Sequence, residues 1–199
     1  MIKKAALGLT LVALLAFVGC GKAPDAEMTA AQTASQTAMS AEAEQYAPAS
    51  YRMAMDTLNA AMAAKTEQDS KFALFRSYGS SKDMFVRAEA LSKQAEADAA
   101  TAKEAMKQEV MTMITNAQAA LDSANAVVAK APVGKGNRAE IELIKTDLVS
   151  VAATFQEAQN DFNAGSYMTA KTKLEAVMEN ANRVASEVAN AAAMKSGKM

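Results

Sequence analysis

The sequence predicts an all-α protein, an elongated antiparallel helical bundle of coiled-coil-like hairpins that share one long central helix. Of the 199 residues 48 are Ala, and Ala, Glu, Lys, Gln and Met all favour helix. Only 8 Gly and 3 Pro are present, too few for the many turns of a β-sandwich or barrel. Apolar residues also recur at alternating spacings of three and four, which is typical of narrow, coiled-coil-like seams.

The first element, residues 1–19, is predicted to be a signal peptide. Lys3 and Lys4 precede an apolar stretch, residues 5–18, that has the length of a signal-peptide core and is too short for an ordinary membrane span. The stretch ends at the only cysteine of the chain, with a small glycine directly before it. This pattern resembles the lipobox of bacterial lipoproteins.

The lipobox resemblance implies cleavage between Gly19 and Cys20 and covalent attachment of diacylglycerol and an N-acyl chain to Cys20. Gly21 follows the cysteine where Asp would direct retention at the inner membrane. By resemblance to the sorting rule of two-membrane bacteria, this implies the periplasmic face of the outer membrane. The alternative is an ordinary secretory signal, or a short anchor helix, with an incidental cysteine.

Residues 20–45 are predicted to be the lipidated cysteine and a partly helical tether. This stretch is rich in Ala, Thr and Gln, with weak helical spacing through Met28, Ala31, Ser35 and Ala38, and it offers little apolar bulk to bury. Residues 46–130 are predicted to form a helical hairpin that contains the long helix. Pro48 suits the first turn of its opening helix, and Asp69 or Thr66 can cap the start of the next.

The long helix has one weak point and one irregularity of spacing. Gly79 costs about 1 kcal/mol relative to Ala within a helix, so the helix can break there. An extra step of four residues leads to Val110, a stutter that locally unwinds a left-handed supercoil. Residues 88–105 carry little apolar bulk, so this stretch should be solvated or pack along a thin seam against the shorter helices or a second copy of the chain.

Residues 131–137 are the predicted loop, and residues 138–195 the C-terminal hairpin that packs on the long helix. Asn137 followed by Glu140 resembles a capping box, and Gly165 is placed to end the first helix of the hairpin. The predicted helix-packing seam of the whole chain consists of Tyr51, Leu58, Phe75, Phe85, Val110, Ile144, Leu148, Val151, Phe155, Phe162, Tyr167, Leu174, Val177, Val184 and Val188.

The composition leaves little for catalysis or metal binding. The chain has no histidine, so it lacks an imidazole base and cannot build the usual Glu-x-x-His di-iron site of a helical bundle. Met53-x-Met55 and Met111-x-Met113 have the spacing of Cu(I)-binding methionine pairs, but residues two apart lie about 200° apart around a helix. We therefore expect no catalytic residue, no metal and no cofactor beyond the lipid.

A further resemblance covers roughly residues 43–106. The Tyr46-Ala47-Pro48 start, the Ala-x-x-x-Leu-x-x-Ala helix and the long Ala-spaced helix after it look like an uncharacterised helical domain of Ala-rich bacterial envelope lipoproteins. That domain sometimes precedes a peptidoglycan-binding domain, and none follows here. The seam is also similar to that of the major murein lipoprotein, but the chain ends Lys198-Met199 rather than in the wall-linked lysine.

These observations favour a non-enzymatic, membrane-anchored envelope lipoprotein that acts as a spacer, scaffold or adaptor through helical packing. Its expected partners are the membrane, through the lipid, and an unknown envelope protein, with self-association possible. Nucleic acid is not expected, because the formal net charge is −1 and the charges are interspersed. The alternative is a periplasmic carrier that holds an apolar ligand between its helices.

Overall fold

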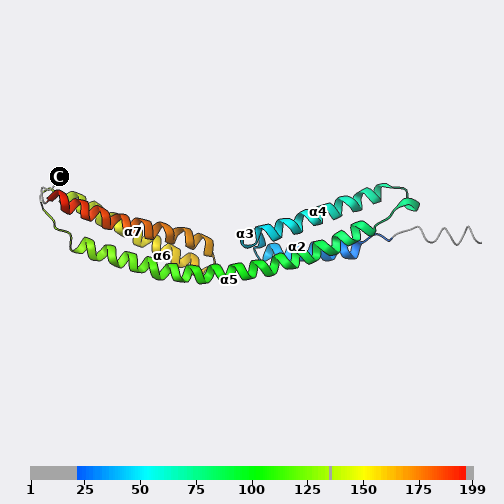
Figure 1. The fold of residues 1–199 in the computed structure, drawn as a ribbon, viewed down its shortest axis with the longest axis horizontal. Coiled ribbons are helices and arrows are strands. Elements are labelled where there is room, and N and C mark those ends of the chain that lie inside the picture. The colour runs from blue at the N-terminus through cyan, green and yellow to red at the C-terminus, as the bar shows by residue number, and fades with distance from the viewer. Residues whose placement is uncertain (1–21, 135, 196–199) are drawn as a thin grey trace, which may run out of the picture. The chain divides into compact units, whose positions relative to one another are not determined.

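The computed structural model describes residues 22–134 and 136–195, and every regular element in these residues is a helix. The chain divides into unit 1, which ends at Ala102, and unit 2, which begins at Lys103. Helix α5 (Gly79–Ala129) contributes its first part to unit 1 and its second part to unit 2 (Figure 1). The predicted all-α bundle, with one long helix shared by two groups of shorter helices, is confirmed.

Unit 1 consists of helices that run back and forth beside the first part of α5 (Figure 1). They are α2 (Asp25–Ser40), the single turn α3 (Ala43–Tyr46), and α4 (Pro48–Ser70). Pro48 occupies the first turn of α4, as predicted, because its fixed φ suits that position and its missing N–H needs no partner there. A short 3-10 turn, η1 (Ala73–Phe75), lies between α4 and α5.

The predicted tether is wrong over most of its length, because α2 is a packed helix. Its Ala31, Ala34, Ser35 and Ala38 are buried. These residues recur at helical spacing and lie on one face of α2. Each alanine side chain buries little area. Because it is small, however, it lets two helices approach closely, so the helices gain van der Waals contacts without large apolar side chains.

The core of unit 1 is correspondingly thin and falls into two clusters. In the first, Leu58 and Phe85 supply the bulk and pack with alanines of α2, α4 and α5. The second consists of Ala38, Ala43, Ala95 and Ala99, with the half-buried Tyr46, Ala47 and Tyr51 against it. The alanine-rich stretch of α5 within residues 88–105 is therefore covered by the shorter helices of the same unit.

The start of the long helix was predicted too early. Helix α4 continues to Ser70, so Thr66 and Asp69 lie inside it, and α5 begins only at Gly79. The seam assignment of Phe75 is also wrong: this side chain is 76% exposed in the 3-10 turn. The helical spacing of Phe75 with Tyr78 is coincidental, because the chain leaves the helix between α4 and α5 to reverse direction.

Unit 2 contains the second part of α5 together with α6 (Arg138–Asn163) and α7 (Tyr167–Lys195). Gly165 ends α6, as predicted, with a φ of +81°. Its N–H donates to Phe162 O at 3.0 Å and the next N–H donates to Asp161 O at 2.9 Å, the two bonds of a Schellman motif. Glycine suits this position because L side chains are strained at such a φ.

The predicted capping box at Asn137 is wrong. The Asn137 side chain makes no capping hydrogen bond to the first turn of α6. It is buried and instead holds the preceding loop: Oδ1 accepts from Gly134 N at 2.8 Å and Nδ2 donates to Pro132 O at 2.8 Å. The loop backbone needs these partners because it has no regular hydrogen-bonding pattern of its own.

Candidate functional site

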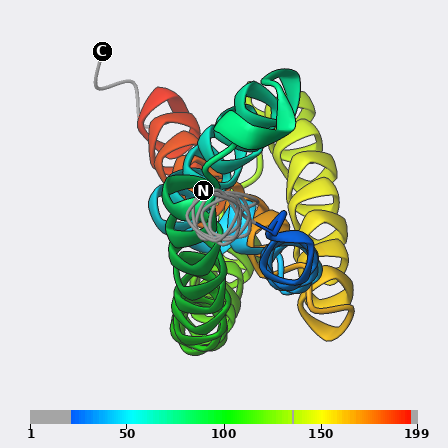
Figure 2. The ribbon, with the colours of Figure 1, turned by 90° about the vertical axis from the view of Figure 1, so that its right-hand side faces the viewer.

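The predicted lipidation residue Cys20 and the cleavage residue Gly19 lie outside the described residues. The nearest described residue is Lys22, three positions before α2 begins at Asp25. We call the end of unit 1 at which α2 starts, α4 stops and α5 starts the proximal end. Figure 2 looks onto this end, with the start of α2 in deep blue and the connection from α4 to α5 in turquoise and green.

Two ion-paired lysines join the three helices at the proximal end. Lys65 Nζ of α4 lies 3.6 Å from Asp25 Oδ1 of α2 and 2.9 Å from Asp69 Oδ2 of its own helix. Lys82 Nζ of α5 lies 3.0 Å from Glu27 Oε1 of α2. The pKa of Glu27 lies below its ordinary 4.5, first because its carboxylate accepts a backbone hydrogen bond and then because of Lys82. The start of α2 is thus held to both neighbours.

The connection from α4 to α5, residues 71–78, is tied to the end of α4 by side-chain hydrogen bonds. Arg76 donates from Nε to Lys71 O at 2.9 Å and from a terminal nitrogen to Asp69 O at 2.8 Å. Gln68 Oε1 accepts from Ser77 N at 3.1 Å. A guanidinium at the last carbonyls of α4 is also favourable for the helix dipole. This connection therefore has a defined conformation.

Three large apolar side chains project from this connection into solvent. Phe72 is 69% exposed, Leu74 56% and Phe75 76%. The two phenylalanine rings lie 6.3 Å apart between centroids, so they form one small patch. Sequence reasoning missed this patch because it sought helical spacing. The signal that marks it is an apolar run, Phe72 to Phe75, bracketed by Lys71 and Arg76.

The other predicted seam residues take part in packing. Tyr51, Phe162 and Tyr167 are half-buried, and the rings of the latter two lie 5.4 Å apart. The rest are buried: Leu58, Phe85, Val110, Ile144, Leu148, Val151, Phe155, Leu174, Val177, Val184 and Val188. Sequence reasoning missed the buried Leu121 and Val128.

The methionine pairs considered for Cu(I) do not form joint sites in their helices. Met53 is 54% exposed, whereas the half-buried Met55 accepts a hydrogen bond on Sδ from Ser35 Oγ at 2.9 Å. Met111 is likewise exposed, whereas Met113 packs against the core of unit 2. In residues 22–134 and 136–195, no group of three or more acidic or cysteine side chains is placed to hold a metal ion.

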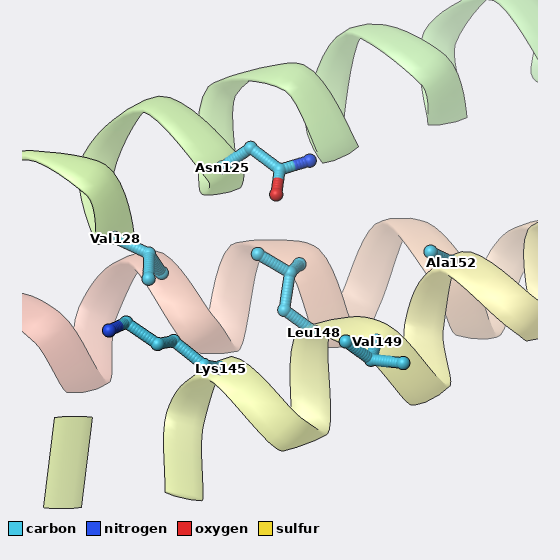
Figure 3. A pocket seen from close by; sticks show the side chains of 6 residues that line it. All are labelled: Asn125, Val128, Lys145, Leu148, Val149 and Ala152. Carbon is cyan, nitrogen blue, oxygen red and sulfur yellow. The ribbon is translucent and has the colours of Figure 1, made fainter. Parts of the chain in front are cut away.

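Unit 2 has small hollows between its helices. One of about 250 Å³ lies between α5 and α6, where Asn125 and Val128 face Lys145 and Leu148 (Figure 3). Another, of about 410 Å³, is lined by Ile114 and Phe155 together with polar side chains such as Gln118 and Asp122. Both have polar groups in their walls.

Comparison of the chain with models of protein families, with curated proteins and with solved structures finds no match. Among the helices of the described part of the chain, none combines the length and the apolar character needed to cross a bilayer.

Proposed function

We propose that this protein is a membrane-anchored envelope lipoprotein, held by a lipid on Cys20, that acts without catalysing a reaction as a spacer, scaffold or adaptor. One observation carries the proposal. Helix α2 starts at Asp25, five positions after Cys20, and its first turn is already joined to α4 and α5 by ion pairs. A lipid at Cys20 would therefore hold a folded helical unit close to the bilayer rather than at the end of a long tether.

The packing supports a structural role. Side chains of α5 supply core residues to both units: Phe85 packs in unit 1, and Val110 packs in unit 2. The cores are made of apolar seams, and many of the surface charges are paired, such as Lys171 Nζ with Glu109 Oε1 at 2.6 Å. Such helices offer long faces for a partner helix and few groups suited to chemistry.

The proposal is tested by labelling cells with radioactive palmitate. The wild-type protein should incorporate label and fractionate with membranes, because the Cys20 thiol is the acylation site. Cys20→Ala should remain an unlabelled precursor with its signal attached, whereas Ser92→Ala, a distant control, should be labelled normally. Label in the Cys20→Ala protein, or a wholly soluble wild type, would contradict the proposal.

The outer-membrane location is tested separately. Gly21→Asp should move the lipidated protein to the inner-membrane fraction of a density gradient, and Gly21→Ala should leave it in the outer-membrane fraction. An unchanged distribution of the Gly21→Asp protein would contradict sorting by this residue.

The alternative, a periplasmic carrier, would use a space between helices such as the hollow beside Phe155. Native mass spectrometry of protein beginning at Gly21 separates the two functions. Mass corresponding to a co-purified lipid would favour the carrier. The scaffold predicts the mass of the protein alone or of its protein complexes.

A further inference from the structure

We propose that the exposed patch Phe72, Leu74 and Phe75 inserts into the surface of the lipid bilayer to which Cys20 is anchored. The inference rests on the proposed lipid anchor and adds a second contact with the membrane. The three large apolar side chains are more than half exposed and lie within four consecutive residues, and the rings of Phe72 and Phe75 lie 6.3 Å apart. Such a concentration of exposed apolar side chains is typical of an interaction surface. The occupant of this surface follows from the position of the lipid anchor.

The short length of chain before α2 limits how far the lipid anchor can lie from unit 1. Fully extended residues span at most about 3.6 Å each, so the Cα of Cys20 lies within roughly 7 Å of the Cα of Lys22. Lys22 lines the same small hollow as the start of α2 and Lys82 of α5. Acyl chains on Cys20 therefore enter the bilayer close to the first turns of α2 and α5.

The patch lies beyond the start of α5, past the point where Lys82 pairs with α2. Lys82 pairs with the first turn of α2, and Tyr78 precedes Lys82 by one helical turn, about 6 Å along the axis. The connection that carries Phe72 and Phe75 comes before Tyr78, beyond the start of the helix. Figure 1 shows this connection at the same end of unit 1 as the start of α2. A bilayer at Cys20 thus meets the patch without any change of fold.

We expect the contact between the patch and the bilayer to be chiefly apolar, because the cations named below already have partners in the protein. Lys65, Lys71 and Lys82 are each paired with a carboxylate, at N–O distances of 2.9 to 3.0 Å for the shortest contact of each. The Arg76 guanidinium donates to backbone carbonyls of α4. Cations that are already satisfied add little attraction to anionic lipids, so insertion should not require them.

The first experiment uses the absence of tryptophan and the single cysteine. Mature protein with Phe75→Trp is coupled through Cys20 to a maleimide lipid in phosphatidylcholine vesicles. The emission of the introduced tryptophan should shift to shorter wavelength and be quenched by brominated acyl chains. The control, Met53→Trp, lies on α4 about 26 Å along the helix from Ser70, is also open to solvent at the wild-type residue, and should remain unquenched.

The second experiment measures binding strength. With one myristoyl chain on Cys20 the protein partitions reversibly into vesicles, since a single chain anchors only weakly. Phe72→Ser, Leu74→Ser and Phe75→Ser together should lower this partition more than about tenfold, because three apolar side chains no longer enter the lipid. Met39→Ser with Met53→Ser should leave it unchanged. Circular dichroism confirms that both proteins keep their helices.

Chemical coupling at Cys20 keeps this test independent of lipidation in the cell. If cells do not acylate Cys20 but the tryptophan of the coupled Phe75→Trp protein is quenched, the lipoprotein proposal fails and the insertion of the patch stands as a property of the surface. If that tryptophan stays unquenched on a protein that is coupled, or the serine variant partitions like the wild type, the insertion is overturned. If the serine variant partitions into vesicles like the wild type but no longer self-associates, the insertion of the patch is also overturned. The patch is then a contact with a second copy of the chain.

Discussion

Tyr78 Oη donates a hydrogen bond of 2.6 Å to Asp69 Oδ1 and so links the residue before α5 to the last turn of α4. This bond holds the pKa of the Asp69 carboxyl below its ordinary 3.8, with Lys65 as the second cause. It also raises the pKa of Tyr78 above its ordinary 10.0, assisted by burial. The same bond fixes where the connection with Phe72 and Phe75 rejoins the helical body.

We predict that Tyr78→Phe lowers stability at neutral pH and that the loss becomes smaller as the pH falls below the ordinary pKa of Asp69. A carboxyl with a lowered folded pKa contributes stability that is present above its ordinary value and is lost as the pH falls through its folded value. Denaturant unfolding at pH 7 and pH 3 checks this. In an Asp69→Ala background, Tyr78→Phe should have little further effect at either pH. A loss of equal size at both pH values in the wild-type background would show that the tyrosine hydroxyl acts through another group.

A second prediction concerns Ser92, whose Oγ is fully buried and has no hydrogen-bond partner among the described residues. A buried polar atom without a partner costs about 1–3 kcal/mol, and Ala favours helix more than Ser does. Ser92→Ala should therefore stabilise unit 1 by about 1 kcal/mol in thermal or denaturant unfolding. Ser81→Ala is the control: this buried hydroxyl donates to Tyr78 O at 3.0 Å, so its removal should be neutral or destabilising. The opposite ranking would mean that Ser92 is satisfied in solution.

A third prediction ranks leucines of unit 2. Leu174 is fully buried, whereas Leu148 is 5% exposed and lines the hollow beside α5. Leucine-to-alanine changes in cores cost about 2–5 kcal/mol, and more where the site cannot relax. Leu174→Ala should lie near the upper end and Leu148→Ala near the lower end. Val149→Ala, at a 71% exposed residue of α6, should cost less than about 0.5 kcal/mol. Equal costs at Val149 and Leu174 would contradict the core assignment.

A fourth prediction tests close approach at the alanine cluster of unit 1. Ala99 is fully buried with Ala38, Ala43 and Ala95. Ala99→Leu should destabilise unit 1 by about 1–3 kcal/mol or more, because the added carbons have no room. Ala99→Ser should cost much less than the leucine deletions of unit 2. Ala97→Leu, at an exposed position of α5, should be near neutral. Tolerance of Leu at both positions would mean that the helices do not pack closely there.

A fifth prediction uses the turn between α6 and α7. Gly165→Ala should destabilise unit 2 by roughly 1 kcal/mol, because the φ of +81° is unfavourable for L side chains although the space is open. Gly79→Ala, where an added Cβ also meets open space, should be neutral or stabilising, because Ala favours the helix that begins there. A neutral Gly165→Ala would show that the turn adopts another conformation.

Local signals predicted most of the fold. The three-and-four spacing of Ile144, Leu148, Val151 and Phe155 in α6 identifies the buried face, since helical periodicity brings such residues onto one side. Pro48 and Gly165 mark a helix start and a helix end, because each depends on the φ of a single residue.

The candidate site was less predictable, because its features depend on which segments meet. Residues 25–40 resembled a tether, because their composition does not indicate that their alanines pack against residues of α4 and α5. Phe75 has helical spacing with Tyr78, yet it is exposed because hydrogen bonds from Arg76 and Tyr78 stop the helix and turn the chain. Asn137 resembled a cap, but its amide is used by the loop before it.

The sequence by itself determined that the chain is helical, where most helices lie and which face of α6 and α7 is apolar, because propensity and periodicity act within a few residues of one another. Only the tertiary structure decided that α2 is part of unit 1 and that Phe72, Leu74 and Phe75 point into solvent at the end where α2 begins. The reason is that burial is a property of pairs of surfaces. Small alanines become core when a second helix fits against them, and large phenylalanines remain exposed when the chain turns before any helix can cover them.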